Sequence, residues 1–154
     1  MLGKAFQAIG NALTQALVSG DFALYQSLIS LPLKVASRDA ATYTIKTQDG
    51  LRADFDLYHR AILIQGVTDI FRDFQEVILV GPGLVVVKFT THILQRANRV
   101  VDPFSSAFHL ERQGKIWRIT AIESAEAHIS WTLGQASVTP AGQFETRDDT
   151  NAKT

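Results

Sequence analysis

Apolar side chains recur at helical spacing in the first part of the chain. Leu2, Phe6, Ile9, Leu13 and Leu17 follow one another at intervals of three or four residues, with polar residues between them. This spacing places them on one face of a helix. We therefore expect an amphipathic first helix that is retained in the mature protein rather than a targeting segment.

A short segment, Ser19-Gly20-Asp21, separates this helix from a second one. Its glycine suits a left-handed C-terminal cap, and its aspartate can accept hydrogen bonds from the amides of the next turn. The second helix is expected over 22–29, because Pro32 bars its continuation. Alternation on either side of Arg38-Asp39-Ala40 then predicts a strand pair, 31–37 and 42–47.

Helical spacing returns from about Asp49 to Gln65. Leu51, Phe55, Tyr58 and Ile62 share one face of this third predicted helix, and Gly66 is its natural end.

After Gly66 the hydrophobic period changes to that of strands, with turns marked by glycine, proline and asparagine. The pattern predicts a four-stranded meander over Val67–Val80, Leu84–Gln95, Arg99–Arg112 and Ile116–Ala125. This order of elements indicates an α+β fold: a cone-shaped, curved antiparallel sheet with three helices on its concave face. We expect one domain over 1–133 and a polar, disordered tail over 134–154, which has too few apolar residues to offset the cost of ordering.

The amino-acid composition limits the kinds of molecule that we expect the protein to bind. The 154 residues include 15 basic and 15 acidic side chains, 46% hydrophobic residues and no cysteine. This balance gives no broad positive field, so we expect neither nucleic acid nor a membrane as a partner. No phosphate loop, paired-carboxylate motif or metal-binding spacing is present, so we expect no cofactor and no metal, and a cytoplasmic location.

Pairing about the Gln113-Gly114 turn sorts the last two strands by face. It sets Leu110 against Trp117 and Phe108 against Ile119, with Ser106 and Ala121 continuing this apolar row. The opposite face then carries His109, Glu111, Arg118 and Thr120.

The face of the preceding strand depends on its turn. A two-residue turn at Ala97-Asn98 would align Val85, Val87, Phe89 and Thr91 with the apolar row and leave His92 outside. A three-residue loop would reverse this assignment, and a bulge at Pro103 could also flip the parity.

Histidine is the usual base and metal ligand near neutral pH, so each of the four is weighed. His59 is expected to be a half-buried histidine on the flank of the third helix. His109 is expected in an interface, His92 on the surface or in an interface rather than in a pocket, and His128 carries no signal.

Three segments carry a resemblance to a known family. Ser19-Gly20-Asp21-Phe22, Gly66-Val67-Thr68 and the hairpin from Phe108 to Ile119 resemble the nuclear transport factor two-like superfamily, which includes polyketide cyclase-like proteins, ketosteroid isomerases and scytalone dehydratase. The resemblance spans about residues 5–127. It implies a pocket inside the cone and a homodimer formed through the outer sheet face.

The catalytic residues of the ketosteroid isomerase-like members do not carry over. Their tyrosine donor falls near Leu13 and their protonated aspartate on Phe108. Their base falls near Ser37, where Asp39 is the nearest carboxylate. Two donors that would stabilise an enolate are therefore missing, and isomerase chemistry of this type is not expected.

The sequence predicts an apolar pocket for a small molecule, with no catalytic residue assigned and the choice between binding protein and enzyme left open. Tyr25 and Tyr58 are singled out because a buried hydroxyl among apolar neighbours needs a partner or a ligand. The expected ligand-binding residues are Tyr25, Phe55, Tyr58, Phe89, Phe108 and Trp117. The alternative is a non-catalytic dimerisation or interaction module without a ligand.

Overall fold

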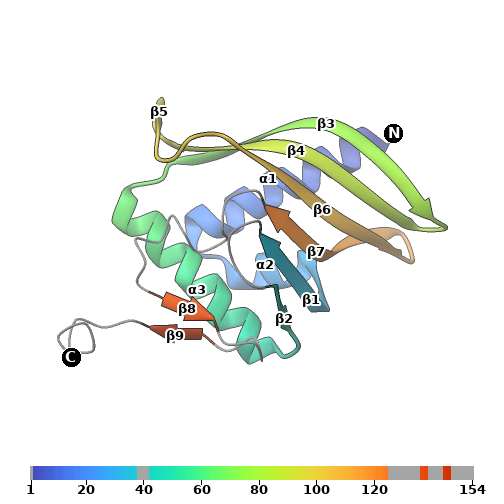
Figure 1. The fold of residues 1–154 in the computed structure, drawn as a ribbon, viewed down its shortest axis with the longest axis horizontal. Coiled ribbons are helices and arrows are strands. Elements are labelled where there is room, and N and C mark those ends of the chain that lie inside the picture. The colour runs from blue at the N-terminus through green and yellow to red at the C-terminus, as the bar shows by residue number, and fades with distance from the viewer. Residues whose placement is uncertain (1, 38–41, 125–135, 139–143, 147–154) are drawn as a thin grey trace.

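The computed structural model describes residues 2–37, 42–124, 136–138 and 144–146. The first half forms α1 (Leu2–Ser19), α2 (Phe22–Leu28), β1 (Ile29–Ser37), β2 (Tyr43–Ile45) and α3 (Gln48–Gln65). The second half forms β3 (Asp69–Gly81), β4 (Leu84–Gln95), β5 (Asn98–Arg99), β6 (Phe104–Gln113), β7 (Ile116–Ser124), β8 (Ala136–Val138) and β9 (Phe144–Thr146) (Figure 1).

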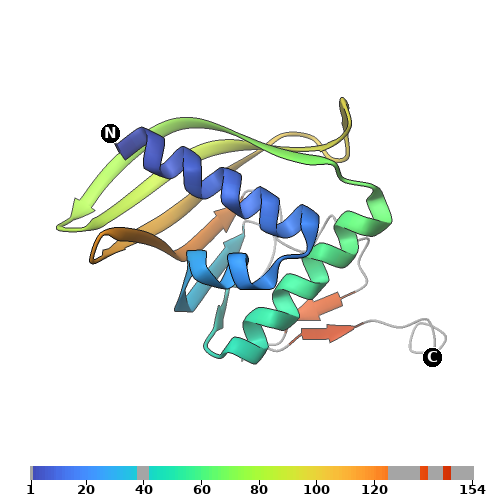
Figure 2. The same ribbon diagram turned by 180° about the vertical axis from the view of Figure 1, so that it is seen from behind.

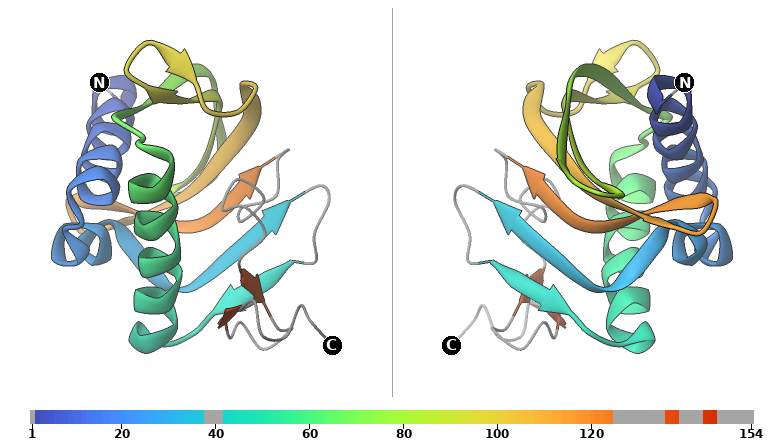
Figure 3. Two further views of the ribbon diagram at one scale, coloured as in Figure 1. Left: turned by 90° about the vertical axis from the view of Figure 1, so that its left-hand side faces the viewer. Right: turned by 90° about the vertical axis from the view of Figure 1, so that its right-hand side faces the viewer.

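Most of the strands form one curved sheet in the order β2-β1-β7-β6-β4-β3, with β5 paired to β4. All three helices lie on its concave side, as the view from behind shows (Figure 2). The end-on views show that the sheet bends around the helices without closing (Figure 3). The predicted α+β class is therefore confirmed, and the sheet is mixed because β1 pairs with β7 in parallel.

The loop between α1 and α2 forms the helix caps that the sequence predicts. The Asp21 carboxylate accepts a hydrogen bond from the Leu24 amide, which caps α2. Gly20 and Gly66 both have positive φ and end α1 and α3.

The predicted face of β4 is correct. Val85, Val87, Phe89 and Thr91 are buried on the concave side and pair with β6, with Val87 opposite Phe108. The tight turn lies one position earlier than predicted, at Arg96-Ala97, because Gln95 pairs with Asn98. His92 lies on the outer face, where its ring contacts Phe71.

The predicted third strand of the meander is not continuous. It divides into β5 and β6, and residues 100–103 between them belong to neither strand. Pro103 has no amide hydrogen to give to a ladder, which favours a break here. The residues of β4 and β6 still face the predicted sides of the sheet, because this segment shifts the register by an even number of residues. Gln95 lies opposite Asn98 before the segment, and Thr91 lies opposite Phe104 after it.

The predicted register of the last hairpin is wrong. Gln113 pairs with Ile116, so the turn is Gly114-Lys115, and Leu110 pairs with Ile119 rather than with Trp117. A β-bulge at Thr120 then adds one residue to β7, so that Phe108 pairs with Ile122 and His109 with Ala121. Ala121 therefore lies on the outer face, and Ile122 takes the inner position that the sequence had predicted for Ala121.

The core lies between the helices and the concave face. The apolar stripe of α1 supplies Phe6, Ile9, Leu13 and Leu17, all buried. Gly10 brings the α1 backbone close to β3, since a methyl group there would lie 3.3 Å from the Phe74 ring and 3.5 Å from the Arg72 side chain.

The predicted tail is described only in part. Within it, β8 and β9 form a two-stranded antiparallel hairpin, while Arg147–Asn151 and the predicted turn residue Asp39 lie outside the described residues. Among the described helices, none has the length and apolar character needed to cross a bilayer.

Candidate functional site

A cavity of about 70 Å³ lies between the concave face of the sheet and the helices. Strand alternation supplies most of its wall, since Phe89, Thr91 and Ile93 follow one another at every second position of β4. Its apolar lining is Leu13, Leu17, Ile70, Phe89, Ile93, Phe104, Phe108 and Ile122, and its polar lining is Tyr25, Tyr58, Arg72, Thr91, Ser106 and Ser124. The cavity is therefore mainly apolar with a small set of inward polar groups.

Four of the six residues expected to bind a ligand meet at this cavity. Tyr25, Tyr58, Phe89 and Phe108 line it, and the Phe89 and Phe108 ring centroids are 4.6 Å apart. Phe55 does not line the cavity but fills the core beside it, 5.0 Å from the Tyr25 ring. Trp117 also lies outside the lining, with its ring packed edge-on against Phe6 at 5.5 Å.

A buried carboxylate, that of Asp54, lies next to the tyrosines of the cavity wall. Asp54 on α3 is completely buried, and its Oδ2 accepts a hydrogen bond of 3.1 Å from the Tyr25 hydroxyl. The sequence offered a signal for this residue, because Asp54 follows Leu51 by three positions and precedes Tyr58 by four, which places it on the apolar stripe of the helix.

The three tyrosines around Asp54 stay protonated. Burial raises the pKa of Tyr25, Tyr43 and Tyr58, and the negative charge of Asp54 raises each further. Near neutral pH these hydroxyls therefore keep their protons, and the Tyr25 hydroxyl donates its single proton to Asp54.

Arg72 supplies the cationic part of the cavity wall. It lies on the concave face of β3, is 8% exposed, and donates from Nη1 to the Gly10 carbonyl at 2.9 Å and to the Thr14 hydroxyl at 2.7 Å. Its guanidinium carbon is 5.7 Å from the centre of the Phe108 ring. Burial lowers the pKa of Arg72 to about 10, so the side chain remains charged at neutral pH.

Two hydroxyls complete the sheet side of the cavity. Thr91 on β4 and Ser106 on β6 share a hydrogen bond of 2.9 Å, and both are buried. Ser124 follows from the end of β7, on the inner face that the Thr120 bulge sets. Sequence analysis missed the place of Ser124 because a bulge at a threonine leaves no marker in the sequence.

Arg72 also borders a second hollow. A groove of about 290 Å³ runs between α1 and β3 and is lined mainly by polar residues, including Gln7, Asn11, Gln15 and Asp69. Ile70 and Arg72 line both the groove and the cavity.

Known structures identify the fold. No protein-family model and no curated protein sequence matches this chain. Among solved structures, an NTF2-like protein of unknown function from Shewanella oneidensis is similar over 82% of this chain and 100% of its own, with a TM-score of 0.63 at 12% identity. The chain has the NTF2-like fold.

Two further NTF2-like relatives carry functional descriptions of their own. A putative dehydratase of the NTF2-like family from Streptomyces avermitilis matches with a TM-score of 0.55 at 14% identity, covering 79% of this chain and 92% of its own. A hexachlorocyclohexane dehydrochlorinase matches with a TM-score of 0.53 at 12% identity, covering 79% of this chain and 82% of its own. At such identities the likeness shows the NTF2-like fold alone.

Two of the three positions compared with ketosteroid isomerases border the cavity, and both carry apolar side chains. Leu13 and Phe108 both line the cavity. Ser37 ends β1, and Asp39 lies outside the described residues.

The described histidines lie away from the cavity lining. His59 Nδ1 is 2.8 Å from the Leu17 carbonyl oxygen, and its half-buried ring stacks on Phe55, as expected for a structural histidine. His109 pairs with Glu123 on the outer face, while His128 lies outside the described residues. In the part of the chain that the structure describes, no group of three histidine or carboxylate side chains could hold a metal ion.

Proposed function

We propose that the protein binds a small, mostly apolar molecule in the cavity under the concave face of the sheet. The observation that carries this proposal is the combination of apolar walls with inward hydrogen-bond donors. Phe89, Phe108 and Ile122 favour an apolar body. Arg72 has more N–H groups than its two hydrogen bonds use, and the paired hydroxyls of Thr91 and Ser106 carry one proton beyond the bond between them, so these groups can donate to a ligand oxygen. The hexachlorocyclohexane dehydrochlorinase that shares the fold acts on a small molecule according to its description, which agrees with this proposal by analogy only.

Xenon is a suitable first probe because it is apolar, fits small cavities and needs no knowledge of the natural ligand. We expect dissolved xenon to shift the methyl NMR signals of Ile70, Ile93 and Ile122, which line the cavity. The signal of Ile116, which is exposed at the far end of β7, should remain unchanged.

A matched pair of variants locates the site. Ser106→Met fills the cavity from β6 and should abolish the shifts, whereas Ser105→Met places the same side chain at the exposed neighbouring position and should leave them intact. Shifts that persist in Ser106→Met would place the probe elsewhere and refute the proposal. Native mass spectrometry of the purified protein, followed by mild denaturation, would then identify any small molecule that it carries.

A second candidate function is a dimerisation module that uses the outer sheet face. The observation in its favour is Phe71, which is 51% exposed on that face beside His92. A homodimer is compatible with a ligand in the cavity, so this candidate competes with the first only if the cavity stays empty.

A further inference from the structure

Arg72 places a full positive charge inside the wall of a mainly apolar cavity. Moving a charged group out of water costs several kcal/mol unless a partner of opposite charge offsets that cost. The partners of Arg72 in the described residues are neutral: the Gly10 carbonyl, the Thr14 hydroxyl and the face of the Phe108 ring. Both hydrogen bonds come from the same nitrogen, Nη1.

The described carboxylates do not neutralise this charge at close range. Within those parts of the chain, no carboxylate lies within 4.0 Å of the Arg72 nitrogens. Asp54 accepts a hydrogen bond from Tyr25. Asp69 accepts a hydrogen bond from the Ile70 amide through its Oδ1 and attracts the Arg72 charge only from a longer distance. Among the described side chains that line the cavity there is no carboxylate.

A ligand could supply the missing negative charge. We propose that the cavity takes a short-chain monocarboxylate, with its carboxylate paired to the Arg72 guanidinium and its carbon chain against Phe89, Phe108 and Ile122. This inference rests on the proposed function and adds the chemical class of the ligand. A guanidinium offers two parallel N–H groups to a carboxylate, which makes this pairing specific as well as strong.

The size of the cavity limits the chain length. It measures about 70 Å³. Drug-sized ligands occupy pockets of about 300–1,000 Å³, so an acid with only a few carbons suits this cavity. Thr91 and Ser106 lie on the same lining, and their paired hydroxyls can bind the second carboxylate oxygen or an α-substituent.

Butyrate and butyramide test the charge directly, because they have nearly the same shape and differ in charge. In NMR titrations of the isotopically labelled full chain at pH 7, we expect butyrate to bind at least about tenfold more tightly than butyramide. Arg72→Met should remove this preference, and Arg112→Met, which changes an exposed arginine of β6, should keep it.

The variant of Arg72 needs a folding control, because this side chain joins α1 to β3. Retention of the amide spectrum and of xenon shifts in Arg72→Met shows that the cavity is intact. The comparison of the two ligands in the wild-type protein needs no variant and stands even if Arg72→Met does not fold.

The outcomes separate the two proposals. Equal affinity for butyrate and butyramide, together with xenon binding, would overturn the carboxylate and leave the cavity proposal standing. Absence of both xenon and butyrate binding would overturn both. Butyrate binding that survives Ser106→Met but not Arg72→Met would place the anion in the groove beside α1 and refute this inference.

Discussion

At the scale of single residues, the arrangement around Asp54 shows how a buried carboxylate is accommodated. Its charge is completely enclosed, and it is held by a hydrogen bond from Tyr25 and lies within electrostatic reach of Tyr43 and Tyr58. A buried charge is tolerated only when its hydrogen-bonding partners are in place. The chain thus surrounds a carboxylate from α3 with tyrosines from α2, β2 and α3 itself.

Removal of one donor should be costly. Tyr25→Phe leaves Asp54 with one hydrogen bond fewer, and because that acceptor is charged, we expect the free energy of unfolding to fall by about 1.5–3 kcal/mol at pH 7. Urea denaturation followed by circular dichroism measures this difference. An unchanged midpoint would show that this hydrogen bond does not support the native state.

The same variant should alter the response to alkali. The pKa of Tyr25 is raised in the folded protein, so its contribution is fully present below about pH 10, the unfolded value, and is lost as the pH rises further. Above that pH the unfolding free energy of the wild type should fall more steeply than that of Tyr25→Phe, by about 1.4 kcal/mol per pH unit. Equal slopes in urea titrations between pH 9 and 11 would contradict the assignment.

At the scale of elements, the two left-handed glycines that end α1 and α3 have different surroundings. A methyl group on Gly20 would lie 2.8 Å from Nε2 of His59, whose ring is fixed by the Leu17 carbonyl and by Phe55. A methyl group on Gly66 would lie equally close to the side-chain amide of Gln95, but that side chain is exposed and can move away.

Alanine at these two positions should therefore differ in cost. Each variant carries the backbone penalty of about 1–2 kcal/mol for a left-handed residue with a side chain. Gly20→Ala should lose about 1–3 kcal/mol more than Gly66→Ala, because it also overpacks a fixed ring. Thermal and urea unfolding of both variants measure the difference, and equal losses would show that His59 is free to yield.

The helices, caps and strand alternation were predictable from the sequence because their signals are local. The Leu13 and Leu17 stripe and the Asp21 cap need no long-range information. The Thr120 bulge was not predictable, because it depends on pairing with a distant strand. Pro103 marked an irregularity between β5 and β6, but its effect on the register depends on the same long-range pairing. The role of Arg72 was also hidden, since its burial follows from the approach of Gly10 on α1.

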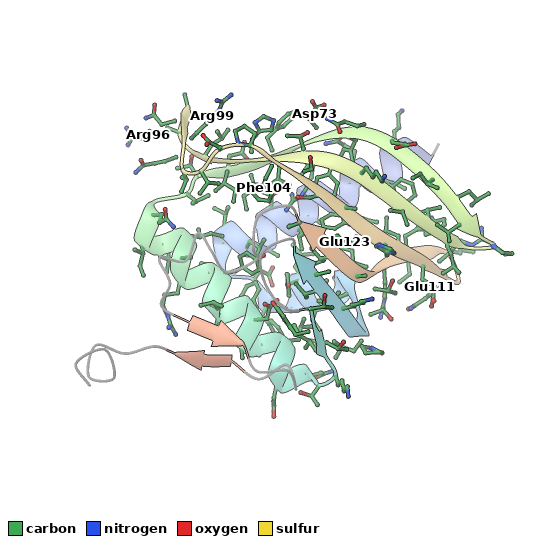
Figure 4. The ribbon with its side chains drawn as sticks, viewed as in Figure 1. Asp73, Arg96, Arg99, Phe104, Glu111 and Glu123 are labelled. Atoms are coloured by element: carbon green, nitrogen blue, oxygen red, sulfur yellow. The ribbon has the colours of Figure 1, made fainter. Side chains whose placement is uncertain are left out.

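At the scale of the whole molecule, the sheet presents two faces of different character. The concave face is covered by the helices along most of β4 and β6, whereas the outer face is open to solvent (Figure 3). Asp73 points away from the helices on this outer side, and Arg96 and Arg99 project from the β4–β5 turn at one end (Figure 4). Toward the same end, the outer face carries the ring contact between Phe71 and His92.

If the outer face forms a dimer, a charge in place of the exposed Phe71 ring should weaken that dimer. We expect Phe71→Asp to shift the sedimentation coefficient at micromolar concentration from the dimer toward the monomer. Leu79→Asp is the matched control, because Leu79 is 73% exposed but shares the inner face of its strand with Val77. A wild-type monomer would remove this candidate, and dissociation by Leu79→Asp alone would move the interface to the β3–β4 tip.

The bulge at Thr120 affects the bend of the strand over the cavity without changing which side chains face the cavity. A chain shorter by this one residue would still place Ala121 opposite His109 and Ile122 opposite Phe108, so each side chain would keep its face. It would lose the local bend that a bulge gives to a strand. Insertions and deletions at this point would thus adjust the volume under the sheet, while substitutions adjust its chemistry, and relatives of this chain can evolve the two independently.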